Sequence, residues 1–276
     1  MRVFTKSSAT PLASIGVTFN TALAASSALV ALAFGLSTWD RWLRRRRPHD
    51  LAWSIAMALF ALGALSLWWA EARGWSSSSF RWFFLFGALT NVPWLALGTV
   101  YLLAGERIGH AVRWGVVLFT GVSAGVCWTA PMKAQVVSDE FPTAKTLFGV
   151  VPRVLAAVGS GVPALVIFAG AVWSAITLLR GNTPTLTQDA RRRVVSHRKL
   201  SLGNILIAAG TVVLSASGTF AGRLGQDRAF AVTLLVGIVV LYVGFFVSST
   251  ATHVAHGERS ATARLLNEVR SAAVSP

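Results

Sequence analysis

The sequence has few charged residues and almost no cysteine. Asp, Glu, Lys and Arg make up 13% of its 276 residues, against about 25% in soluble domains. The mean hydropathy is +0.61, a value that excludes a disordered chain and argues against an ordinary soluble enzyme. The single cysteine, Cys127, excludes a disulfide framework and a cysteine-based metal site.

A second absence concerns ionisable side chains inside the apolar stretches. Seven stretches reach the roughly 20 residues needed to cross a bilayer core, and none has a charged residue in its central part. Intramembrane carboxylates are the usual proton relays of pumps, so their absence disfavours proton or cation pumping. The stretch 230–252 also lacks the lysine that a retinal protein needs. The seven stretches are residues 15–39, 51–70, 80–104, 111–130, 154–179, 202–221 and 230–252.

This pattern predicts an all-α polytopic membrane protein folded as a seven-transmembrane-helix bundle. A soluble helical bundle would show a polar stripe on each helix, and these stretches show none. We expect residues 1–256 to form the transmembrane domain and residues 257–276 to form a short cytoplasmic tail.

The basic residues predict the orientation of the bundle. The formal net charge is +15, and the connections on one side hold sixteen Lys and Arg against nine on the other. Because cytoplasmic loops are enriched in Lys and Arg, the N-terminus is predicted outside and the C-terminus in the cytoplasm, as in a bacterial cytoplasmic membrane. Nucleic-acid binding is not expected, because these charges lie beside the bilayer. The arginines expected to anchor the topology and contact anionic lipid headgroups are Arg44, Arg45, Arg46, Arg47, Arg191, Arg192 and Arg193.

Two prolines lie inside apolar stretches. Pro93 removes the amide donor to the carbonyl of Leu89, and Pro163 does the same to Gly159. Each proline is expected to kink its helix and to leave a backbone carbonyl that a neighbour must satisfy. A static kink and a hinge that lines a ligand site both fit this pattern.

Uncharged polar residues near these prolines predict a small pocket in the outer half of the bundle. The long outer connection 131–148 is placed to cover such a pocket. Interhelical hydrogen bonding is the commoner role of polar residues in membrane helices, and it stays as the alternative. The candidate ligand-binding residues are Asn91, Ser160, Ser215 and Thr219.

Histidines on the predicted cytoplasmic side are the candidate metal ligands. His253 and His256 share a helix face if the last helix continues, and His110 lies just before the fourth stretch. Metal or haem at this edge is an alternative to ordinary solvated histidines, and we expect no cofactor. No nucleotide-binding glycine loop or zinc-protease motif is present.

One further pattern covers residues 15–110. An N-out first helix is followed by the basic loop at Arg44 to Arg47, Trp-rich helix ends, Pro93 and the exit 99–103 with Tyr101. This pattern resembles the seven-helix membrane input modules that precede bacterial sensor histidine kinases. In that family the seventh helix leads into a cytoplasmic catalytic domain. Here the chain ends about 24 residues after Thr252, so the resemblance implies no enzymatic output.

Three hypotheses follow for the function. The first is a non-catalytic sensory, scaffold or accessory module that acts through a protein partner, or a second copy, at its cytoplasmic face. The second is a carrier of a small molecule or lipid with a pocket in the outer half of the bundle. The third is a metal- or haem-dependent membrane enzyme that uses the inner-side histidines.

Overall fold

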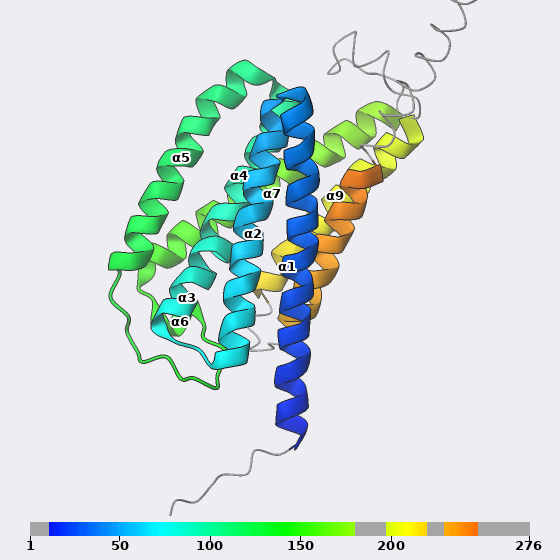
Figure 1. Ribbon diagram of the computed structural model, residues 1–276. Helices are drawn as coiled ribbons and strands as arrows, with labels where there is room; N and C mark the ends of the chain where they lie inside the picture. Colours follow the sequence, from blue (N-terminus) through cyan, green and yellow to red (C-terminus); the bar gives the residue numbers. More distant parts are fainter. Residues whose placement is uncertain (1–10, 180–196, 220–228, 248–276) are drawn as a thin grey trace, which may run out of the picture.

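The protein is helical, and the computed structural model describes residues 11–179, 197–219 and 229–247 (Figure 1). No strand occurs in these ranges, so the all-α prediction is confirmed. The elements are α1 (Pro11–Arg45), α2 (Pro48–Arg73), α3 (Ser77–Phe84), the π-helix η1 (Leu85–Thr90), α4 (Asn91–Ala104), α5 (Glu106–Thr129), α6 (Ala144–Leu147), α7 (Val150–Leu179), α9 (His197–Thr219) and the helix Ala229–Val247.

Within the described ranges, six helices are long and apolar enough to cross a membrane, as in a multi-pass membrane protein. The six spans are Phe19–Arg45, Pro48–Arg73, Ser77–Ala104, Glu106–Thr129, Val150–Ser174 and Ala229–Val247. Residues 202–219 of the predicted stretch 202–221 lie on α9, where the apolar part found among the described residues is the shorter Ile205–Leu214. A seventh span and the orientation of the termini therefore stay predictions.

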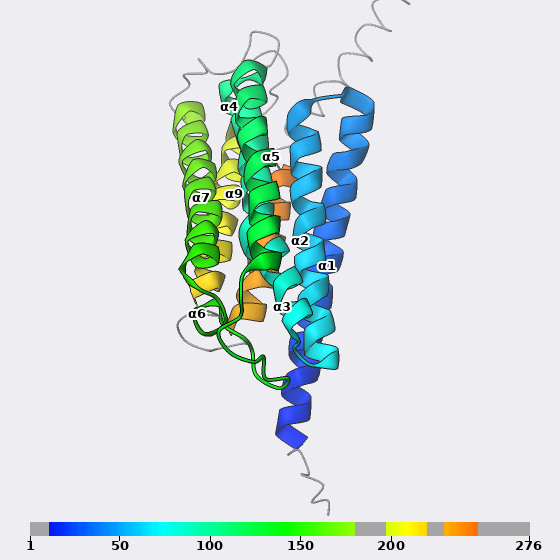
Figure 2. The same cartoon turned by 90° about the vertical axis from the view of Figure 1, so that its left-hand side faces the viewer.

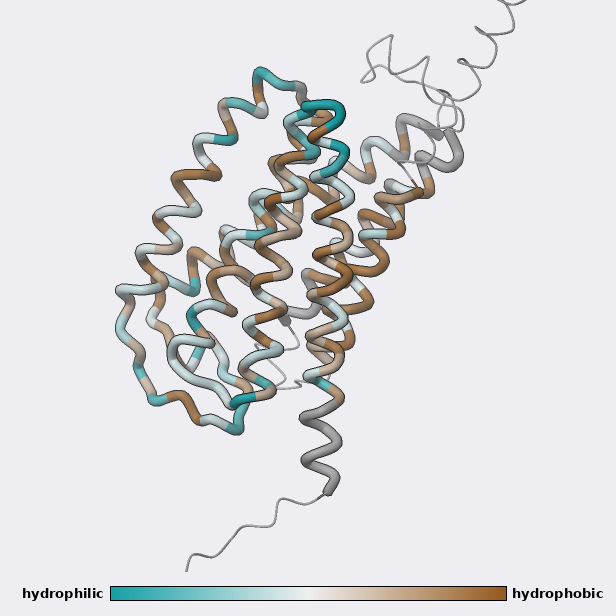
Figure 3. Tube along the Cα trace, viewed as in Figure 1, coloured by the Kyte–Doolittle hydropathy of each residue, from teal (hydrophilic) through white to brown (hydrophobic). Residues whose placement is uncertain are grey.

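Most helices run beyond the apolar stretches that predicted them. The first stretch ends at residue 39, whereas α1 continues to Arg45, and α5 begins at Glu106 rather than at residue 111. Hydropathy marks only the part of a helix that lies in hydrocarbon, while backbone hydrogen bonding continues into the headgroup layer. In Figure 3 the midsections of the helices are hydrophobic, and hydrophilic residues gather at the two ends of the bundle.

The helices pack as a bundle with α4 near its centre. α4 contacts α2, α5 and α7, while α1 packs along α2 and α9 along α7 (Figure 2). The α1–α2 and α4–α5 turns lie at one end, and residues 131–148 with α6 lie at the other (Figure 1). The five arginines at residues 41–47 therefore lie at the end opposite the long connection.

The turn between α1 and α2 is set by Arg46 and Pro48. Arg46 takes a positive φ of 53° and its amide donates to the carbonyl of Trp42 (2.7 Å), which ends α1. Pro48 occupies the first turn of α2, and Arg47 before it is extended, as a residue before proline prefers. The two helices therefore reverse direction within two residues and pack side by side.

Glycines allow close approaches between helix backbones. A Cβ at Gly63 on α2 would lie 3.0 Å from the amide nitrogen of Gly87 on η1. A Cβ at Gly210 on α9 would lie 2.8 Å from the amide nitrogen of Leu241 on the last helix. Because lipid tails are as apolar as leucine, such close backbone packing is a main source of helix association.

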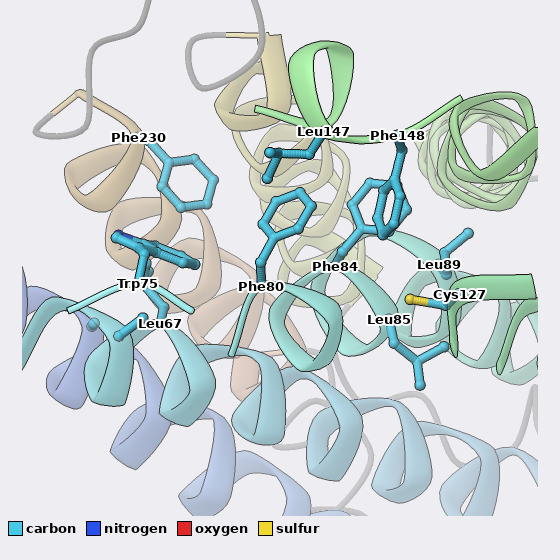
Figure 4. Packing of buried hydrophobic residues seen from close by; sticks show 12 residues of the cluster. Leu67, Trp75, Phe80, Phe84, Leu85, Leu89, Cys127, Leu147, Phe148 and Phe230 are labelled. Carbon is cyan, nitrogen blue, oxygen red and sulfur yellow. The ribbon is translucent and has the colours of Figure 1, made fainter. Parts of the chain in front are cut away.

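An aromatic cluster closes the end of the bundle that holds residues 131–148. Trp75 meets Phe141 (ring centroids 5.2 Å apart), and Phe141 meets Phe230 (5.4 Å). Phe148 is fully buried against Phe80 (Figure 4). The amide of Trp75 also donates to the carbonyl of Ser138 (2.9 Å). The long connection is thus fastened to the bundle by both ring contacts and backbone bonds.

The close packing at Gly63 predicts a specific loss of stability. Gly63→Leu would press a side chain against the backbone of η1, and overpacking of this kind costs about 2 kcal/mol. Gly121→Leu on α5 is the matched control, because a Cβ there meets nothing within 4 Å. Thermal unfolding of the two variants in detergent measures the difference, and equal stabilities would contradict the packing.

Candidate functional site

A cavity of about 660 Å³ lies among α2, α3, η1, α4, α7, α9 and the Ala229–Val247 helix, next to residues 141–144. Its volume falls in the range of about 300–1,000 Å³ typical of small-molecule sites. No charged side chain lines it among the described residues, and most of its wall is apolar. We call it the outer cavity. Its aromatic wall consists of Phe60, Phe80, Phe83, Phe84, Phe141, Phe168 and Phe230.

Four uncharged polar side chains interrupt this wall: Asn91, Thr143, Ser160 and Thr211. Asn91 is buried, and its Oδ1 accepts from the amide of Val92 (2.7 Å). Ser160 donates its hydroxyl to the carbonyl of Ala156 (2.6 Å), which leaves its oxygen able to accept. The cavity therefore offers a few hydrogen-bonding groups to a ligand that is otherwise apolar.

The helices that contain Pro93 and Pro163 meet beside the outer cavity. η1 widens the helix before Pro93, and Thr90 donates its hydroxyl to the carbonyl of Leu85 (2.9 Å). The carbonyl of Leu89, which Pro93 deprives of a donor, lies 3.0 Å from where a Cβ of Gly159 would be. Gly159 is the residue whose own carbonyl loses its donor to Pro163. α7 itself stays helical through Pro163.

The outer cavity reaches the apolar surface of the bundle beside α7 and α9. Leu165 on α7 lines the cavity and is 68% exposed, and Val212 on α9 lines it and is 52% exposed. Phe168 also lines it and is exposed. These three residues border the cavity and also contribute to the exposed apolar surface of α7 and α9.

A second cavity of about 190 Å³ lies at the end of the bundle that holds the α1–α2 turn. We call it the inner cavity. Its wall includes a cluster of ionisable residues, namely Arg41, Arg45, Arg47, His49 and Asp50. The inner cavity thus differs in chemistry from the outer one.

A buried ion pair links α1 and α2 at the inner cavity. Nη2 of Arg41 donates to Oδ1 of Asp50 (2.7 Å), and the Asp50 side chain is 3% exposed. The Arg41 guanidinium also lies over the ring of Phe245 (4.2 Å to the centroid). Nε2 of His49 lies 3.8 Å from the second Asp50 oxygen. Removing either partner of such a pair leaves a buried charge uncompensated.

Three apolar side chains separate the two cavities. Leu95 on α4, Ile167 on α7 and Leu241 on the last helix line both of them. Ile167 and Leu241 are almost fully buried. Trp53 supports this layer from the inner side, since its Nε1 donates to the carbonyl of Leu95 (3.2 Å). The cavities therefore lie in series, with one layer of side chains between them.

The structure brings together part of the predicted ligand-binding set. Asn91 and Ser160 both line the outer cavity, and the connection 131–148 contributes to its roof. Ser215 and Thr219 lie on the last turns of α9, but their side chains are outside the described part of the chain. Sequence reasoning missed the aromatic wall, because phenylalanines in a membrane helix carry no sign of which face they line.

One of the three candidate metal ligands, His110, lies among the described residues. His253 and His256 lie outside the described residues. His110 was expected just before its helix, but α5 begins at Glu106, so His110 lies in the second turn. It is exposed, with Nδ1 2.6 Å from the carbonyl oxygen of Glu106. The described residues hold no group of three or more metal-ligating side chains.

The predicted arginine anchors divide into two kinds. Arg45 and Arg47 line the inner cavity. Arg44 is exposed and pairs with Asp40 (2.9 Å), and Arg46 lies over the ring of Trp42 (4.7 Å). Arg191, Arg192 and Arg193 lie outside the described residues.

The pair of Arg41 and Asp50 was also missed. The one available signal was an aspartate near the start of a membrane helix, nine residues after an arginine. That spacing has no meaning until the two-residue turn is known.

No protein-family model, curated protein or solved structure matches this chain.

The ion pair makes a prediction about stability. Asp50→Asn should lower the free energy of unfolding by about 3 kcal/mol, because it leaves the Arg41 charge buried without its partner. Asp40→Asn breaks an exposed pair at the same turn and should cost about 0.5 kcal/mol or less. Thermal or denaturant unfolding of both variants in detergent measures these losses. Equal losses in the free energy of unfolding for the two variants would refute the role of the buried pair.

Proposed function

We propose that this protein is a membrane carrier for an apolar small molecule or a lipid. The observation that carries the proposal is the arrangement of two cavities in series, with the layer of Leu95, Ile167 and Leu241 between them. A carrier needs a site that communicates with each side of the membrane in turn, and one removable barrier between two cavities meets that need.

The chemistry of the outer cavity supports an apolar cargo. Its wall is aromatic and aliphatic and holds no charged side chain among the described residues. Asn91 and Ser160 would orient the cargo through one or two hydrogen bonds, as sparse polar groups do in apolar sites. The opening beside Leu165 and Val212 would admit the cargo from the bilayer.

The helix segments at Pro93 and Pro163 are the ones that would move during transport. Helices interrupted by proline bend at lower cost than intact ones, because fewer backbone bonds must be broken. η1 and residues 159–163 both border the outer cavity and contact each other. A change of angle there would shift Ile167, four residues after Pro163, and so open the layer.

The sensory or accessory hypothesis uses the same outer cavity in a different way. A sensor would bind the molecule and pass a signal to a partner at the cytoplasmic face, without moving the molecule across the membrane. The inner cavity and its single separating layer favour the carrier.

Filling the outer cavity tests the binding step. A Cβ at Gly161 meets nothing within 4 Å, so Gly161→Phe adds a ring at the cavity wall without a collision. We expect the fluorescent apolar probe N-phenyl-1-naphthylamine to bind the purified protein and to lose most of its affinity for this variant. Gly121→Phe on α5 is the control, since it adds the same ring in open space away from the cavity. Ala164→Phe, which also lies on the cavity wall, should behave like Gly161→Phe.

Movement across the membrane is tested in proteoliposomes that contain NBD-labelled phosphatidylcholine. Dithionite bleaches only the label on the outer leaflet, so a protein that carries lipid across raises the bleached fraction. We expect this rise for the wild type and for Gly121→Phe, and a much smaller rise for Gly161→Phe. Probe binding without any rise would favour the sensory module over a lipid carrier.

A further inference from the structure

The inner cavity has a charged mouth that carries a net positive charge. Three guanidinium groups, those of Arg41, Arg45 and Arg47, line it against one carboxylate, that of Asp50. Arginine presents a planar set of donors that matches carboxylate and phosphate oxygens in pairs. Because water is partly excluded from a cavity inside a helical bundle, charge attraction there exceeds that at an open surface.

Asp50 does not use all the donors of Arg41. Nη2 of Arg41 donates to one oxygen of Asp50. Nε of Arg41 is buried and finds no partner in the described part of the chain. Asp50 thus fixes the Arg41 guanidinium at the cavity wall through one of its nitrogens, while Nε is enclosed by protein.

The inner cavity continues from this mouth into an apolar interior. Its deeper wall includes Phe34, Leu103 and Phe245, and it ends at the layer of Leu95, Ile167 and Leu241. A volume of about 190 Å³ is too small for a whole lipid and suits a headgroup with the start of its chain. The gradient from cationic to apolar is that of a site for an amphiphile with an anionic head.

We infer that the inner cavity binds the anionic head of an acidic amphiphile, a carboxylate or phosphate on an acyl chain, through Arg41, Arg45 and Arg47. This inference rests on the proposed function, since it names the class of molecule that the carrier would handle. Arg41 is held in place by Asp50, while Arg47 approaches the head from the turn. The acyl chain follows the apolar wall toward the outer cavity.

The same turn contains its own control for nonspecific attraction. Arg44 lies three residues from Arg47, but it is exposed, pairs with Asp40 and does not line the inner cavity. A general attraction of the basic turn for anionic lipid would involve Arg44 and Arg47 alike. Binding inside the cavity would involve Arg47 and not Arg44.

The test measures binding of radiolabelled probes to the full chain in phosphatidylcholine nanodiscs. The probes are oleate, oleoyl lysophosphatidate, oleyl alcohol and inorganic phosphate. We expect one site for the two acidic amphiphiles, weakened about tenfold by Arg47→Gln and less than about twofold by Arg44→Gln. The relative affinities of oleate and oleoyl lysophosphatidate tell which anionic head the site prefers.

Three outcomes would overturn the inference. Equal losses of affinity in Arg47→Gln and Arg44→Gln would show that the binding is nonspecific attraction to the basic surface. Binding of oleyl alcohol as tight as that of oleate would remove the role of the charge. Binding of inorganic phosphate as tight as that of lysophosphatidate would remove the role of the chain.

Arg45→Gln is a second cavity variant, and the unfolding temperature of each variant shows whether the fold is intact.

The binding assay contains no transport step, so it separates the two proposals. Arginine-dependent binding without lipid movement in proteoliposomes would leave the site standing and refute the carrier. Lipid movement together with binding that does not depend on Arg45 and Arg47 would support the carrier and refute the anionic site.

Discussion

Inside a bilayer, backbone carbonyls and amides must find their partners within the protein, and this requirement governs how the bundle is built around its two proline-containing helices. Pro93 and Pro163 each remove one amide donor, and the structure places the resulting gaps side by side, with the Leu89 carbonyl against Gly159. η1 absorbs the change of register before Pro93. The outer cavity lies beside this junction, so the prolines that remove backbone donors also lie close to the candidate site.

Much of the fold follows from the apolar stretches alone, because a membrane helix must be long, apolar and uninterrupted by charge. Each predicted stretch falls on a helix that begins a few residues before it, whereas the predicted ends at 221 and 252 lie outside the described residues. The π-helical turn was not predicted, since Leu85 to Thr90 look like any apolar helix and only packing against Gly63 and α7 shows why the wider turn is tolerated. The described part of α9 leaves the seventh crossing as a prediction.

The candidate site was predictable where polar residues stand out against an apolar background. Asn91 and Ser160 were found in this way, and so was the connection that contributes to the roof. Arg41 and Asp50 were not, because their pairing depends on a two-residue turn created by Arg46 and Pro48. The layer of Leu95, Ile167 and Leu241 is invisible to sequence reasoning for a simpler reason, since three aliphatic residues from three helices meet only in the folded bundle.

The central claim is that two cavities lie on opposite sides of one apolar layer, and thiol accessibility measures this directly. Cys127 is the single cysteine and is fully buried, so the wild type should show little reaction with a maleimide in intact vesicles. Ser160→Cys in the outer cavity and Thr99→Cys in the inner cavity should react from opposite sides of the membrane, and Leu241→Cys in the layer should react slowest. Reaction of Ser160→Cys and Thr99→Cys from the same side, at similar rates, would contradict the account.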